Sequence, residues 1–400
     1  MGSPTLPGAE PYYRRKLRVK FPVSILCIAC IVIYSQFIIL PQFISGPSPS
    51  ALRLSHFQLQ RLDAGLQKCA EFSTAPIQYE FPVSSSRVNP RWNPSSGQKE
   101  TIILRNATLF DGESFIGAAD IEFSKGVVVS VSPTSAAGPA PQGAQIVELD
   151  GKYVTPGLVD MHSHHLGMAW PLIPETDDTN EIHPDTGPLT PFVRSLDGMK
   201  PYDIATAHIA SGGITSSLIL PGSANIMGGE AFAVKNAPNS GASGEERVED
   251  LLLEHGIPEA NRRRYMKMAC GENPKRLYHH NRMGNAWIFR HHMERAKELV
   301  GKQDAWCLSA AVARESGDVA AIAPLVDPSS SDKGGLPEEL ELDSSVAMLR
   351  GKIGINVHCY EPEDFEDMLL HSKEFNFRIQ AFHHALSAWK VPEMLKESGE

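Results

Sequence analysis

The segment at residues 154–167, V-T-P-G-L-V-D-M-H-S-H-H-L-G, restricts the possible folds of this 400-residue chain more than any other. Its short apolar run lies between Pro-Gly and Gly, which indicates a buried strand that ends in three histidines. Side chains alternate between the two faces of a strand, so His162 and His164 point the same way, about 7 Å apart, and His165 points to the other face. The segment therefore predicts a strand whose first two histidines can converge on one cation, and the alternative for an isolated H-x-H pattern is a polar loop.

The charge of the chain argues against a nucleic-acid partner. The formal net charge is -10, and the first 20 residues carry a local charge of +4, so the remainder carries -14. Nucleic-acid phosphates need a basic footprint, which an acidic globular region lacks. With 42% hydrophobic residues over 400 positions, the chain can bury a sizeable core in more than one globular unit.

Residues 21–40 contain no charge, and about 20 apolar residues are enough to cross a bilayer as a helix. Five basic residues precede this stretch, so the positive-inside rule predicts a signal-anchor: a cytosolic N-terminus and a lumenal or extracellular remainder. A cleaved signal peptide is the alternative, although its apolar region is normally shorter. The sequence thus predicts a single-pass membrane protein with one transmembrane helix.

The next segments predict a stem and a small β-domain. Within residues 41–100, leucines recur at helical spacing over 51–70 and are followed by a linker rich in Pro, Ser and Asn. Residues 101–153 alternate β-rich runs with the turn pairs Asp111-Gly112 and Lys125-Gly126, which indicates hairpins in a small sheet.

Residues 154–400 show the alternation of strands and helices that is typical of an α/β barrel. After the histidine strand, further strands are expected at 214–220, 232–235, 264–270, 351–360 and 377–384, with helices at 201–211 and 362–375 and a helix starting near Ala286. Two later strands end in histidine, namely at His358 and at the pair His383 and His384, which places ligands at the C-terminal rim of a parallel barrel. The paired histidines at 279–280 and 291–292 are interpreted as part of a solvated face.

From residue 101 onward the chain resembles the amidohydrolase superfamily, close to its imidazolonepropionase-related members. The resemblance implies a (β/α)8 TIM-type barrel behind a small β-domain. It also implies His162, His164, His358 and His384 as metal ligands. His384 is preferred over His383 because H-A-L-S-A-W-K resembles the family run H-A-x-E-A-x-K.

The resemblance further implies a divalent metal, with zinc as the default for imidazole ligands. Lys267 lies where many members carry a carboxylated, metal-bridging lysine, and Glu272 is the rival, because other branches use a glutamate. The family's catalytic aspartate belongs to an eighth strand, and Asp160 would lie one layer too deep to replace it. The sequence therefore predicts an incomplete barrel of about six strands, a truncated form that binds metal weakly and does not turn over substrate, and it leaves the catalytic residue unassigned.

The predicted function is metal-dependent hydrolysis of carbon-nitrogen bonds in non-peptide or cyclic amides, with metal-activated water as nucleophile. One alternative is a deacetylase of N-acetyl sugars, and another is a membrane-tethered barrel without catalysis that only binds. The expected partners are a small-molecule amide, the membrane through one N-terminal helix, and a second copy of the chain in a homo-oligomer.

Cysteine usage agrees with a compartment that permits disulfides. Two of the six cysteines lie within residues 21–40, which leaves Cys69, Cys270, Cys307 and Cys359. Four cysteines allow three pairings, and their spacing does not choose among them.

Overall fold

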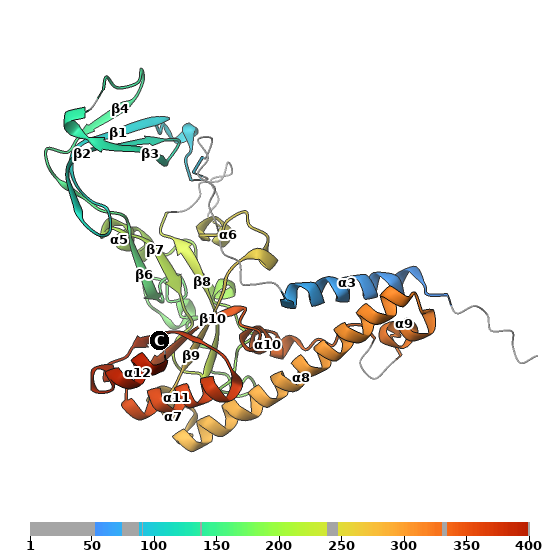
Figure 1. Ribbon diagram of the computed structural model, residues 1–400. Coiled ribbons are helices and arrows are strands. Elements are labelled where there is room, and N and C mark those ends of the chain that lie inside the picture. Colours follow the sequence, from blue (N-terminus) through green and yellow to red (C-terminus); the bar gives the residue numbers. More distant parts are fainter. Residues whose placement is uncertain are drawn as a thin grey trace, which may run out of the picture.

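The computed structural model describes residues 53–73, 88–89, 91–136, 138–237, 247–329 and 334–398. Figure 1 shows these residues as three parts: a small β-sheet at one end, a larger sheet covered by helices, and an arm of helices that projects from the larger part. The predicted metal ligands all belong to the larger sheet or to the residue that follows one of its strands.

The small sheet contains the predicted hairpins. Its strands are β1 (Thr101–Phe110), β2 (Phe115–Ser124), β3 (Val127–Pro133), β4 (Gln145–Glu148) and β5 (Tyr153–Val154). The first three are antiparallel neighbours in sequence order, whereas β4 and β5 each pair with β1 in parallel. Lys125 and Gly126 both have positive φ, which is the backbone that a tight two-residue hairpin turn requires.

The larger sheet has six strands in sequential order. They are β6 (Leu158–Ser163), β7 (Ile214–Ile219), β8 (Met227–Lys235), β9 (Arg264–Ala269), β10 (Ile353–Cys359) and β11 (Ile379–His384). The sheet curves so far that His162 on its first strand touches His383 on its last, with 2.7 Å between their Nδ1 atoms. The predicted α/β barrel is therefore confirmed in part, as a nearly closed, barrel-like sheet of six strands.

One strand departs from the predicted parallel pattern. The sequence indicated a short parallel strand at 232–235, but β8 is longer and runs antiparallel to both of its neighbours. Only residues 220–226 connect it to β7. A parallel crossover needs a dozen or more residues, so this connection can only turn the chain back on itself.

Helices cover the outer face of the larger sheet. They are α4 (Ser195–Gly198), α5 (Ala205–Ser211), α6 (Val248–Leu251), α7 (Glu272–Tyr278), α8 (Arg282–Ser316), α10 (Asp343–Leu349), α11 (Pro362–Phe375) and α12 (Pro392–Ser398). Met266 and Val357 from the sheet pack in one buried cluster with Phe289 of α8 and Phe365 of α11. Helix α11 has the predicted bounds, because Pro362 suits a first helical turn and Asn376 ends the helix in the left-handed conformation.

The arm consists of α3 (His56–Ser73), the second half of α8, and α9 (Val319–Val326). Leu62 and Trp306 lie in its small apolar core, and Trp306 occupies the space that a Cβ on Gly65 would need. A disulfide between Cys69 and Cys307 joins α3 to α8. The second disulfide joins Cys270 to Cys359, so the structure selects one of the three pairings that the sequence left open.

The membrane prediction is corrected. Within the described ranges, no helix combines the length and the apolar character needed to cross a bilayer. The predicted span at 21–40 lies outside the described residues. The structure therefore gives no support to the predicted single-pass topology and lumenal location, and we do not retain them.

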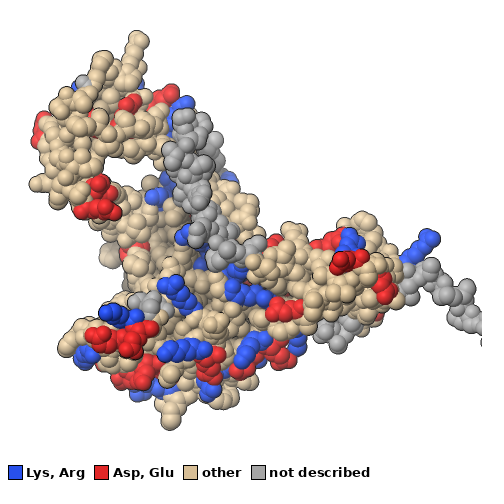
Figure 2. Space-filling view, viewed as in Figure 1, with Lys and Arg blue, Asp and Glu red and all other residues tan. Residues whose placement is uncertain are grey.

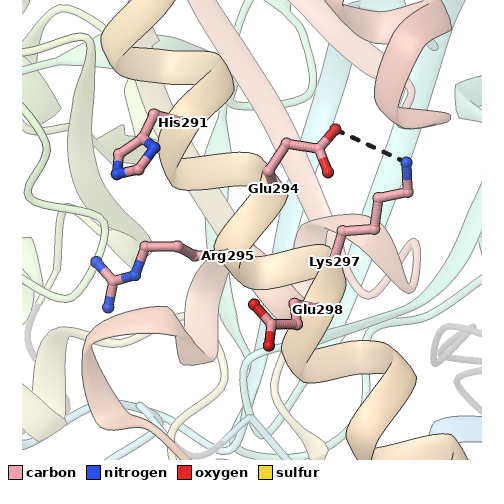
Figure 3. A pocket seen from close by; sticks show the side chains of 5 residues that line it. All are labelled: His291, Glu294, Arg295, Lys297 and Glu298. Carbon is pink, nitrogen blue, oxygen red and sulfur yellow. Dashed lines mark ion pairs between the residues drawn. The ribbon is translucent and has the colours of Figure 1, made fainter.

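The interpretation of the paired histidines as a solvated face is wrong for His292. This side chain is buried between α8 and α10, where its Nε2 lies 2.7 Å from Ser345 Oγ. Helix α8 begins at Arg282 rather than near Ala286. Its neighbour His291 is exposed and stacks on Trp287. Figure 3 shows His291 with four charged side chains of α8, a group with the mixed charge of a solvated helix surface.

Burial of His292 should make stability depend on pH. Burial lowers the pKa of His292 from 6.5 to about 4, so the unfolded chain binds this proton below about pH 6.5 and the folded chain does not. The free energy of unfolding should therefore fall by up to about 3 kcal/mol between pH 6.5 and 4 on account of this residue. Urea unfolding at several pH values should show a shallower slope for His292→Gln. Equal slopes in both proteins would contradict the assignment.

Candidate metal centre

The C-terminal ends of four strands bring the predicted ligands to one edge of the larger sheet. Strand β6 delivers His162 and, one residue beyond its end, His164, whereas β10 and β11 deliver His358 and His383 directly opposite each other in the ladder. Lys267 on β9 lies opposite Asn356 on β10. Side chains that oppose each other in neighbouring strands share a face, so these strands present one polar face at the rim.

His162 and His164 converge as the alternation of the strand predicts. Their Nε2 atoms lie 3.2 Å apart. His164 Nδ1 lies 2.9 Å from the carbonyl oxygen of Leu220, which can only accept, so Nδ1 carries the ring proton and Nε2 presents a lone pair. His165 points to the other side, where it contacts Ser163 and Asn236.

The protonation of His383 is also fixed by its neighbours. The side-chain amide of Asn356 donates to the carbonyl oxygen of Gly354, which leaves its Oδ1 3.0 Å from His383 Nε2. That nitrogen must therefore donate, and the other ring nitrogen, Nδ1, presents a lone pair toward His162.

With these two assignments, His162 carries too few ring protons to hydrogen-bond to both His164 and His383. A neutral imidazole carries a single ring proton, which can fill either the 2.7 Å contact with His383 or the 3.2 Å contact with His164, but not both. Burial, followed by the nearby charge of Lys267, lowers the pKa of His162 to about 2, so a second proton is not available near neutral pH. A bound cation would satisfy the two facing lone pairs.

The donor set fits a divalent metal, although the rings are not yet arranged around a common point. Two nitrogens bound to one tetrahedral zinc lie about 3.3 Å apart, which the His162 and His164 pair matches and the 2.7 Å contact to His383 does not. Within the described part of the chain, no three His, Cys, Asp or Glu side chains already converge as a metal site. Rotation of the His383 ring would be needed for it to join the first two.

His384, the predicted ligand from the last strand, lies at the same rim. Its ring centroid is 4.4 Å from that of His162 and 4.9 Å from that of His358. The side chain is exposed and its φ is +63°, whereas His383 is buried with 5% of its surface exposed. Ligation by His384 stays a prediction, and His383 is the candidate whose lone pair already points at His162.

His358 presents a second unsatisfied nitrogen. Its Nε2 lies 2.7 Å from Glu272 Oε1, so this nitrogen donates to the carboxylate and Nδ1 carries the lone pair. His358 Nδ1 and Glu272 Oε2 are both buried without a hydrogen-bond partner. Burial lowers the pKa of His358, which keeps the ring in the neutral form that can bind metal.

Lys267 is fully buried at the same face. Its Nζ lies 3.3 Å from the carbonyl oxygen of Pro221, and burial lowers its pKa to about 7. Near neutral pH a large share of the side chain is therefore the uncharged amine. Its charge contributes less to the low pKa of His162 than burial does.

The sequence interpretation missed the groups that orient the histidines. Asn356 precedes His358 by two residues and therefore lies on the same face of the strand, which the N-V-H pattern could have revealed. The Leu220 carbonyl had no sequence signal, because any residue supplies one. Such outer contacts fix the tautomer of a metal-binding histidine.

Comparison with known proteins gives two informative matches. The chain is 36% identical to "Amidohydrolase tasK" of Hapsidospora irregularis over 97% of its own length and 39% of that protein, so it spans about two fifths of this relative. An amidohydrolase structure from Thermotoga maritima MSB8 matches with a TM-score of 0.58 and 29% identity, over 74% of this chain and 67% of that one. The chain is thus similar in sequence to one protein named an amidohydrolase and in sequence and fold to another. No family model matches the chain.

Proposed function

We propose that this chain is part of a metal-dependent hydrolase that cleaves carbon-nitrogen bonds in non-peptide or cyclic amides. The observation that carries the proposal is the proton deficit of His162, which lies between two histidine lone pairs and has a pKa near 2. The names of both matched proteins, each called an amidohydrolase, support the reaction class.

The residues at the rim would divide the work between holding the metal and handling protons. His162 and His164 would hold the cation, with His358 and a histidine of β11 as further ligands. When bound, a divalent cation such as zinc would lower the pKa of water toward 7 and polarise a carbonyl group. The Leu220 carbonyl and Asn356 would keep the ligand rings in their binding tautomers.

Glu272 is the carboxylate best placed to move a proton. One oxygen accepts from His358, and the other is buried without a partner, so Oε2 can take a proton from the nucleophile and return it to the leaving nitrogen. Asp160 is less suited, because its Oδ1 accepts from the backbone amide of His162. The neutral amine of Lys267 is the form that carboxylation would require.

The proposal is tested by metal content and turnover. Because Glu272 can take the place of the catalytic aspartate that the sequence comparison lacked, the expectation of weak binding without turnover is replaced by its opposite. The purified 400-residue chain should retain a divalent metal by elemental analysis and lose it to a chelator. It should hydrolyse at least one member of a panel of N-acyl, N-acetyl-sugar and cyclic amides only when loaded with metal. Bound metal without turnover would instead favour a binding protein. Absence of any metal affinity would refute the proposal.

Substitution of Asn356 provides a more selective test of which histidine of β11 binds the metal. Asn356→Leu removes the acceptor for His383 Nε2 and should lower zinc affinity about 10–100-fold, as loss of an outer contact typically does. Asn356→Asp keeps an acceptor and should lose much less. Titration with zinc measures both. Unchanged affinity in Asn356→Leu would show that His383 is not a ligand and would favour His384.

A further inference from the structure

The backbone holds β6, the strand that carries His162 and His164, only weakly. Among the described strands β6 pairs only with β7, because it lies at the edge of the sheet. The ladder between them gains one residue on β6 between Asp160 and Ser163, and in this fully described ladder no pair includes Met161 or His162. A bulge of this kind leaves backbone groups without their ladder partners. The end of β6 therefore needs further contacts to keep the two ligands in place.

Ion pairs on the surface do not supply those contacts. Asp160 is the only Asp, Glu, Lys or Arg residue in β6, and β7 contains none. The Asp160 carboxylate accepts from the backbone amide of His162, within the strand itself. Figure 2 shows a largely uncharged surface over β6 and mixed charges over α11 and α12. The contacts that fix the strand must therefore come from its buried side.

A cluster of buried polar side chains lies on the face of β6 opposite to the two ligands. We define the back anchor as Ser163, His165, Ser217 and Asn236, each of which is at most 9% exposed. Ser163 and His165 alternate with the ligands along the chain, so their side chains point to the other face. Ser217 belongs to β7, and Asn236 directly follows β8. The back anchor thus joins the end of β6 to β7 and to the end of β8.

The hydrogen bonds of the back anchor form a complete network. Asn236 Nδ2 donates to the carbonyl oxygen of Ile214 and to Ser217 Oγ, each at 2.9 Å. Both amide hydrogens are thereby used, so Oδ1 accepts from His165 Nε2 at 3.2 Å. His165 Nδ1 then accepts from Ser163 Oγ at 2.7 Å. A satisfied buried network fixes its members in one arrangement, whereas loss of one member leaves a buried polar atom unpaired.

We infer that His165 is a positioning residue for the candidate metal centre. Through Asn236 it fixes the end of β6 and so keeps His162 and His164 convergent on one cation. His165 is the residue next to His164, so a displaced His165 ring moves the backbone of a ligand directly. The inference rests on the proposed function, since it concerns the metal affinity of the same centre. It assigns a role to the third histidine of the H-S-H-H run, which points away from the metal ligands.

Zinc titration of the full-length chain tests the inference. His165→Leu removes the donor to Asn236 and should lower zinc affinity about tenfold, the lower end of the range for a lost outer contact. His165→Gln keeps an amide donor near the position of Nε2 and should stay within about threefold of the wild type. A wild-type affinity in His165→Leu would overturn the positioning role.

His292→Leu is the matched control for the loss of a buried histidine. His292 also lies close to a serine hydroxyl, that of Ser345, but between α8 and α10. Its replacement should lower the temperature of thermal unfolding and leave zinc affinity unchanged. Equal losses of zinc affinity in His165→Leu and His292→Leu would show a general effect of destabilisation and would contradict the inference.

A double variant tests whether His165 acts through Asn236. Asn236→Leu breaks the same hydrogen bond from the other side, so it should also weaken zinc binding. The double variant His165→Leu with Asn236→Leu should bind zinc about as weakly as either single variant, because residues that share one contact are not additive. Losses that add in full would refute the coupling.

Hydrogen exchange of the metal-free chain separates this inference from the proposed function. Amides of residues 158–166 should exchange at least about tenfold faster in His165→Leu than in the wild type, and His292→Leu should leave them unchanged, because only the first variant frees the end of β6. A wild-type chain without zinc affinity would refute the proposed function. Zinc binding by the wild type, together with unchanged exchange in His165→Leu, would overturn the positioning role alone.

Discussion

His162→Asn should leave the full-length chain without bound divalent metal and without hydrolytic activity. His162 faces lone pairs on both sides, from His164 and His383, so its loss removes the centre of the predicted ligand set. Loss of an outer contact already costs about 10–100-fold in affinity, and loss of a direct ligand should exceed 100-fold. A metal that supplies several kcal/mol to the transition state implies that turnover falls by at least about 100-fold.

Elemental analysis and zinc titration measure the first effect, and hydrolysis of a responsive amide measures the second. His291→Asn is the matched control, because His291 is exposed on α8, where it stacks on the Trp287 ring and belongs to no part of the rim. Both proteins should show the same thermal unfolding. Full metal occupancy in His162→Asn would exclude the centre described here, whatever the activity.

Arg264→Met should destabilise the fold by about 3–5 kcal/mol, the cost of leaving a buried charge without its partner. Glu230 on β8 is 6% exposed, and its carboxylate accepts from Arg264 on β9 and from Ser344 Oγ of α10 at 2.5 Å. Glu230, Arg264 and Ser344 lie in the wall of a cleft of about 890 Å³ on the outer side of the sheet. Their hydrogen bonds join the strand pair β8 and β9 to the covering helix α10.

The double variant Glu230→Met with Arg264→Met distinguishes the electrostatic contribution of the ion pair from the packing of its side chains. A buried ion pair replaced by apolar side chains of similar volume is often as stable as before, so the double variant should recover most of the loss. Urea unfolding of the two single variants and the double variant measures the coupling. A double variant that is as unstable as Arg264→Met would show that the charge of Glu230 is not the cause.

Features that depend only on neighbours along the chain follow from the amino-acid sequence. The alternation of a strand places His162 and His164 on one face and His165 on the other, and this needs no tertiary information. The hairpin turn at Lys125-Gly126 and the bounds of α11 likewise follow from local backbone preferences. These elements were predicted correctly because the residues that form them carry the necessary conformational signal.

Features that depend on contacts between distant residues are visible only in the folded chain. Cys69 pairs with Cys307 across 238 positions, and His292 is buried only because α10 packs over it. The curvature of the sheet brings His383 to within 2.7 Å of His162, although 221 residues separate them. A sequence pattern predicts on which face of a strand a side chain lies, but not which distant strand packs against that face. The set of side chains in the candidate metal centre is therefore known only from the curvature of the folded sheet.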